Sequence, residues 1–139
     1  NNTMNNLNEL SKQIYEGNKL RGFDVSKENI GQTLMLVVSE LAEALEADRK
    51  DKRKMLNAFE QDLGYAKLSI SDFETENENC DWLKNRFETT VKDTFEDEIA
   101  DSFIRLFDLC GGLGIDIEKH IDLKLRYNST RIFKHGKRY

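Results

Sequence analysis

Residues 36–47 read Leu-Val-Val-Ser-Glu-Leu-Ala-Glu-Ala-Leu-Glu-Ala, and the rest of the chain is organised around this stretch. Its central quartet, Glu40-Leu41-Ala42-Glu43, returns almost unchanged as Glu98-Ile99-Ala100-Asp101. On a helix that turns about 100° per residue, the two acids of each quartet lie about 60° apart, beside a broad apolar stripe. The sequence therefore predicts two amphipathic helices that carry carboxylates at matching positions.

The two apolar stripes are expected to bury against each other, as amphipathic helices of a small domain do. The first stripe consists of Leu34, Val37, Val38, Leu41 and Leu45, and the second of Phe95, Ile99, Phe103, Leu106, Leu109 and Cys110. Ala42 and Ala100 are small enough to let the two backbones approach. This packing would bring four carboxylates to one edge of the core, where like charges require a cation.

A solvated acidic face is the alternative interpretation of the same residues. The chain holds 26 Asp and Glu among 139 residues. At that frequency, about five acid-x-x-acid pairs are expected by chance. The spacing of one pair therefore carries no information, and the metal-site hypothesis depends on the matched positions of two pairs beside long apolar stripes.

Composition favours an all-α protein that forms one domain over residues 1–139. The chain is 38% hydrophobic and 34% charged, with no proline and only eight glycines, whereas all-β domains need many tight turns. No apolar run approaches the length of a membrane-spanning helix, so no membrane partner is expected. The two cysteines, Cys80 and Cys110, show no disulfide framework, and we expect reduced thiols in a cytoplasmic protein.

Charge is distributed unevenly along the chain. The net charge is −5, yet residues 119–139 hold seven Lys or Arg and only one acid, Asp122. This asymmetry argues against broad binding of nucleic acid and predicts a local anion site beside an acidic one. Lys124, Asn128 and Arg131 would share one face if the last helix continued that far.

About five helices are expected from the apolar periodicity. They cover residues 4–20, residues 27–49 after a cap at Ser26, residues 55–66, a long helix from about 81 or 91 to 109, and residues 117–128 after a cap at Asp116. Gly111-Gly112 is expected to stop the long helix. An exposed polar connection is expected around residues 69–80.

The donor types indicate which cation the carboxylates would bind. Neither His120 nor His135 lies three residues from a candidate Glu, so the Glu-x-x-His signature of di-iron bundles is absent. A site built from carboxylate oxygens alone suits a hard cation, so we expect Mg²⁺, with Mn²⁺ as a possible substitute. No phosphate-binding P-loop string occurs.

Four features, taken in their order along the chain, resemble those of the MazG-like nucleoside triphosphate pyrophosphohydrolases of the all-α NTP pyrophosphatase superfamily. They are Gly22-Phe23, the stretch 36–47, the quartet 98–101, and Lys124-x-x-x-Asn128-x-x-Arg131 with the Lys134-His135-Gly136-Lys137 tail. The resemblance covers most of the chain outside residues 50–90. The gap of 55 positions between Glu43 and Glu98 is longer than in compact members, so residues 50–90 could be an insertion.

The resemblance implies a Mg²⁺-dependent enzyme that converts an NTP or dNTP and water to the monophosphate and pyrophosphate, as housekeeping of nucleotide pools. It assigns the metal and the catalysis to Glu40, Glu43, Glu98 and Asp101, and the triphosphate to Lys124, Asn128 and Arg131. It also implies a helical bundle completed by dimerisation, which agrees with the extension of the second stripe by Phe103 and Phe107. A homodimer or higher homo-oligomer is therefore expected.

Two other functions stay open at this point. One is a pyrimidine-specific dUTP or dCTP pyrophosphatase of the same superfamily, which a nucleotide panel would separate from a general enzyme. The other is a helical interaction module without turnover, which an assay for pyrophosphate release with Mg²⁺ or EDTA would identify.

Overall fold

The computed structural model describes residues 6–131, and these residues contain six α-helices, two short 3-10 helices and no strand. The helices are α1 (Leu7–Leu20), α2 (Ile30–Arg49), α3 (Leu56–Ala66), α4 (Glu78–Thr90), α5 (Phe95–Leu113) and α6 (Ile117–Ser129), with η2 (Lys27–Asn29) and η3 (Ile70–Glu74) between them. The prediction of an all-α protein is confirmed. No helix in this part of the chain is both long and apolar enough to cross a membrane.

The chain divides into two compact units. One comprises residues 1–34 and 104–139, and the other residues 35–103. The helices α2 and α5 each contribute residues to both units. Both predicted pairs of acids belong to the unit formed by residues 35–103.

Helix ends agree with the caps that the sequence predicts. Ser26 forms a capping box with Asn29 at η2, directly before α2, and the Asp116 side chain accepts a hydrogen bond from the Lys119 amide at the start of α6. Asn77 caps α4 in the same way through the Asn79 amide. These side chains satisfy amide groups that a helix leaves without a partner at its first turn.

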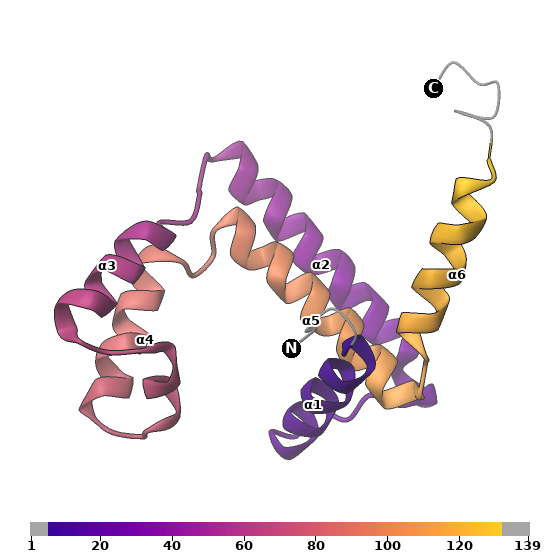
Figure 1. The fold of residues 1–139 in the computed structure, drawn as a ribbon, viewed down its shortest axis with the longest axis horizontal. Helices are drawn as coiled ribbons and strands as arrows, with labels where there is room; N and C mark the ends of the chain where they lie inside the picture. Colours follow the sequence, from indigo (N-terminus) through magenta and orange to yellow (C-terminus); the bar gives the residue numbers. More distant parts are fainter. Residues whose placement is uncertain (1–5, 132–139) are drawn as a thin grey trace. The chain divides into compact units, whose positions relative to one another are not determined.

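The unit of residues 35–103 has a hydrophobic core between α3 and α4, which lie side by side (Figure 1). Phe59, Leu63 and Leu83 are its buried centre, and the rings of Phe73 and Phe87 pack against Phe59 with centroids 6.5 and 6.3 Å away. Phe73 lies in η3, inside the connection predicted around residues 69–80. That connection is therefore partly helical and partly buried.

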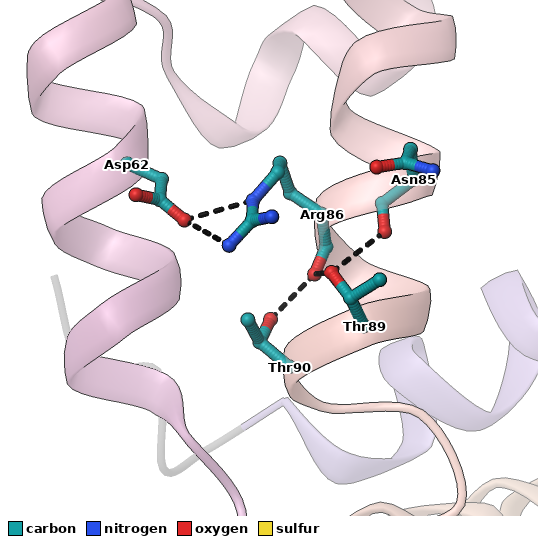
Figure 2. A network of polar contacts seen from close by, with 5 residues as sticks. All are labelled: Asp62, Asn85, Arg86, Thr89 and Thr90. Carbon is teal, nitrogen blue, oxygen red and sulfur yellow. Dashed lines mark hydrogen bonds and ion pairs between the residues drawn. The ribbon is translucent and has the colours of Figure 1, made fainter.

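One ion pair joins the two helices beside this core. The Arg86 guanidinium of α4 donates to Asp62 of α3 from Nε at 2.8 Å and from a terminal nitrogen at 2.5 Å (Figure 2). The Thr90 hydroxyl donates to the Arg86 carbonyl oxygen at 2.5 Å, at the end of α4. The contact between Arg86 and Asp62 is charge-assisted, and such a contact holds two helices together more strongly than a neutral hydrogen bond does.

The observed helix α5 differs in two ways from the long helix that the sequence predicts up to Leu109. It begins at Phe95, since residues 91–94 separate it from α4, and it continues through Gly111-Gly112 to Leu113. The prediction that this glycine pair stops the helix is wrong. A Cβ on Gly111 would lie 2.9 Å from the Ser11 carbonyl carbon, and one on Gly112 would lie 2.8 Å from the Val25 carbonyl oxygen. The glycines are there because neighbouring backbone leaves no room for side chains.

Candidate metal centre

Two helices bring three of the predicted carboxylates together. Glu40 and Glu43 lie one turn apart on α2, and Glu98 lies in the first turn of α5. One carboxylate oxygen from each of the three fits within 4.8 Å of the others. Glu40 and Glu98 are only 8% and 6% exposed, whereas Glu43 is exposed. Two buried carboxylates and one exposed carboxylate, from two separate helices, thus converge on one point.

The fourth predicted residue, Asp101, lies one turn after Glu98 and is half-buried. It is not among the three side chains that converge within 4.8 Å. Its negative charge nevertheless contributes to raising the pKa of both Glu43 and Glu98. Asp101 is therefore close enough to act on the cluster, at its edge.

Crowding changes the proton affinity of these groups. Burial, then a hydrogen bond with Glu40, then the charges of Glu43, Glu40 and Asp101 raise the pKa of Glu98 to about 7. A hydrogen bond with Glu40 is also the largest cause of the raised pKa of Glu43. Two carboxyl groups can share a hydrogen bond only if one of them carries a proton, so a proton can take the place of a cation among these crowded acids.

Two further acids belong to this environment, and the sequence reasoning missed both. The Asp93 amide donates to the Asp97 carboxylate at 3.0 Å, and Asp93 has a left-handed backbone with φ 61°. Burial raises the pKa of Asp97, and the charges of Asp93 and Glu40 add to this rise. Asp97 could have been found, because it lies four residues before Asp101 and so shares its side of the helix.

The prediction that the two apolar stripes bury against each other is wrong. Val37 is buried, but Leu34, Val38, Leu41 and Leu45 are 44 to 52% exposed. On α5, Phe103 and Leu106 are 57% and 40% exposed, and only Leu109 and Cys110 of the stripe are buried.

The buried side of α2 is polar and small instead. It follows a spacing of four and three residues and consists of Thr33, Val37, Glu40, Ala44 and Ala47. Ala42 and Ala100, expected at the contact, are both exposed. Small side chains let helices approach closely, and Ala44 and Ala47 provide them on the side of α2 that carries Glu40. The wide apolar side of α2 consequently points away from the buried positions.

The residues predicted for the triphosphate lie in the other compact unit. Lys124 and Asn128 are on α6, all three residues are exposed, and the Lys124 ammonium lies 5.0 Å from the centre of the Tyr127 ring. The helix ends at Ser129, so Arg131 does not continue the helical face of the other two. Their role with phosphate stays a prediction. The Lys134-His135-Gly136-Lys137 tail lies outside the described residues.

The donor set fits a hard divalent cation, because it offers only carboxylate oxygens and two of the three side chains are deeply buried. Cys80 and Cys110 are buried free thiols, and neither belongs to the cluster. No model of a protein family matches the chain, and neither a curated protein nor a solved structure matches it.

Proposed function

We propose that this protein is a Mg²⁺-dependent nucleoside triphosphate pyrophosphohydrolase, which converts an NTP or dNTP and water to the monophosphate and pyrophosphate. The observation that carries the proposal is the convergence of Glu40, Glu43 and Glu98 from two helices within 4.8 Å. Burying like charges is unfavourable unless a cation or a proton compensates them. The MazG-like resemblance of the sequence supplies the reaction class.

The residues have distinct roles in this proposal. Glu40, Glu43 and Glu98 hold the cation, and Asp101 adds a carboxylate at the edge of the cluster. A bound Mg²⁺ supplies Lewis acidity and lowers the pKa of a coordinated water. A ligand oxygen must be deprotonated, so Glu40 and Glu98 would hold the cation as carboxylates.

Hydrolysis in this scheme joins the oxygen of water to the α-phosphorus and breaks the bond from that phosphorus to the oxygen bridging the α and β groups. The leaving pyrophosphate takes the electron pair of that bond. A carboxylate of the cluster that does not ligate the cation accepts the proton of the attacking water. Asp101 suits this role, since it lies at the edge of the three converging groups.

We also propose that a second copy of the chain covers the exposed apolar row of α2 and forms a homodimer. In this row, Leu34, Val38, Leu41 and Leu45 recur at intervals of four, three and four residues, which is the spacing of helices that pack along their length. Exposed apolar patches larger than several hundred Å² are uncommon on monomers. Self-association through one patch by a twofold axis is the commonest way to cover it.

The helical interaction module without turnover remains the second candidate, because the same apolar row could bind a different protein. Purified protein tests both. Pyrophosphate release should be measured across the common NTPs and dNTPs with Mg²⁺, with Mn²⁺ and with EDTA. Release that needs the metal supports the enzyme, and preference for dUTP or dCTP would identify the narrower pyrimidine enzyme. Absence of release from every nucleotide at high enzyme concentration would refute the enzymatic proposal.

A further inference from the structure

Two segments meet where α2 ends and α5 begins. The Lys52 carbonyl oxygen accepts from the Phe95 amide at 3.0 Å, and the Met55 amide donates to the Thr90 carbonyl oxygen at 2.9 Å. Between them, the Lys54 amide donates to the Glu96 carboxylate at 2.9 Å. Residues 52–55 are therefore held against residues 90–96 by three hydrogen bonds. We call these two segments the junction.

Cations are frequent at and beside the junction, and some of them are already engaged. The Arg53 guanidinium pairs with Asp48 and lies 4.8 Å from the centre of the Phe95 ring. The Lys50 ammonium pairs with Glu46 at 3.1 Å. These two cations have partners that fix them to the protein.

Three other lysines at the junction are not engaged in ion pairs of this kind in the part of the chain that the structure describes. Lys52, Lys54 and Lys92 are exposed, and their ammonium groups make no ion pair within residues 6–131. Lys52 and Lys54 belong to one hydrogen-bonded segment, and Lys92 belongs to the other. The junction therefore presents three positive charges that are not paired within the described residues, on a backbone that hydrogen bonds hold in place.

The carboxylate cluster lies next to the junction along α5. Asp97 forms the link, since its carboxylate accepts from the Asp93 amide and Asp93 directly follows Lys92. Asp97 directly precedes Glu98 on α5, so this hydrogen bond places the backbone of Lys92 and Asp93 beside the residues that begin the cluster on α5.

We propose that Lys92, with Lys52 and Lys54, binds the β and γ phosphates of a triphosphate whose α-phosphate lies at the carboxylate cluster. This inference rests on the proposed function, because it places the substrate at that metal site. A polyphosphate needs positive charge along its whole length, and the cluster and the junction would supply a divalent cation and ammonium groups close together. The junction would also retain the pyrophosphate product, which carries the same groups.

The test uses binding and does not depend on turnover. Isothermal titration of the full chain with inorganic pyrophosphate in excess Mg²⁺ measures the affinity of the junction for pyrophosphate. Titration with Mn²⁺ alone measures the affinity of the carboxylate cluster for a divalent cation. The variants are Lys92→Met, Lys92→Arg and the double change Lys52→Met with Lys54→Met. Lys84→Met is the control, because Lys84 is an exposed lysine on α4 outside the junction.

Lys92→Met should weaken pyrophosphate binding about tenfold, the usual effect of one lost charge-assisted contact. The double variant should weaken it further, whereas Lys92→Arg and Lys84→Met should bind as the wild type does. All variants should bind Mn²⁺ equally well. Wild-type affinity for pyrophosphate in both Lys92→Met and the double variant would overturn this inference while leaving the metal site intact. Failure of the wild type to bind Mn²⁺ would overturn the proposed function and this inference together.

Discussion

The carboxyl groups of Glu40, in the middle of α2, and Glu98, in the first turn of α5, each place an oxygen within 4.8 Å of the other. Both groups are acids, and both are more than nine-tenths buried. Such an arrangement is stable only while a proton or a cation compensates the two like charges. Removing the proton without adding a cation would leave two buried negative charges in contact.

This pair predicts how stability depends on pH in the metal-free protein. The folded pKa of Glu98 is about 7, above the ordinary 4.5, so the folded state binds this proton more tightly than the unfolded state. The contribution of Glu98 is therefore fully present below about 4.5 and is lost as pH rises through 7. Thermal unfolding should show the wild type losing stability relative to Glu98→Gln between pH 5 and 8, by about 2–3 kcal/mol.

Adding Mg²⁺ should reverse that loss in the wild type and have less effect on Glu98→Gln, since a cation that binds only the folded state stabilises it. The comparison with Glu98→Gln removes the contribution of other groups that titrate in the same range. If stability fell with pH in parallel for the wild type and Glu98→Gln, the assignment of the raised pKa to Glu98 would be wrong.

The carboxylate cluster predicts which acids matter for turnover. Glu43→Ala and Asp101→Ala should each abolish Mg²⁺-dependent pyrophosphate release. Both should leave the helical spectrum unchanged and the metal-free protein at least as stable, because each removes one of several repelling charges. Glu46→Ala is the matched control, since Glu46 is on α2 one turn beyond Glu43 and pairs with Lys50 and Arg49 at the surface. Full activity in either cluster variant would refute the site.

The resemblance assigns Arg131 to phosphate, and this assignment predicts a separation of effects. Arg131→Ala should raise the KM for the nucleotide and lower turnover, because a guanidinium that contacts phosphate contributes a charge-assisted hydrogen bond. The affinity for Mn²⁺, measured by titration without nucleotide, should not change. An equal loss of metal affinity would place Arg131 at the metal instead.

The exposed row on α2 predicts an oligomer. A mass of about twice 16.2 kDa is expected from sedimentation or light scattering across a tenfold dilution. Leu41→Glu places a charge in the middle of the row and should yield monomers, whereas Tyr65→Glu should not, because Tyr65 is 86% exposed on α3 outside the row. A constant mass near 16.2 kDa for the wild type at micromolar concentration would exclude the dimer.

Gly111 predicts a large effect from one methyl group. A Cβ there would lie 2.8 Å from the Tyr15 Cβ and 2.9 Å from the Ser11 carbonyl carbon, so Gly111→Ala should destabilise the protein by about 2–3 kcal/mol. Gly31→Ala is the control, since nothing lies within 4 Å of the added Cβ and alanine favours helix by about 0.5–1 kcal/mol. Chemical denaturation measures both. Equal stability of the two variants would show that α1 can shift away from α5.

Local sequence was sufficient to determine the helices and most of their ends. Apolar periodicity located α1, α2, α3 and α6 to within a few residues, and Ser26 and Asp116 identified two starts. Both signals act over one or two turns, so neither needs a distant partner. Three of the four matched acids, at positions 40, 43 and 98, converge in the structure, while Asp101 lies at the edge of the cluster. Helical spacing alone puts each pair on one side of its helix.

Tertiary structure alone decided which side of each helix is buried. The widest apolar stripe of α2 was expected in the core, yet Val38 and Leu41 of that stripe lie at the surface while Glu40 is buried. Amphipathicity predicts that a side of a helix will be covered, but it does not predict by which segment or by which chain. The role of Gly111 was hidden for the same reason. A glycine that ends a helix and a glycine that admits a neighbouring backbone look identical in sequence, and only the position of the Ser11 carbonyl group against it distinguishes them.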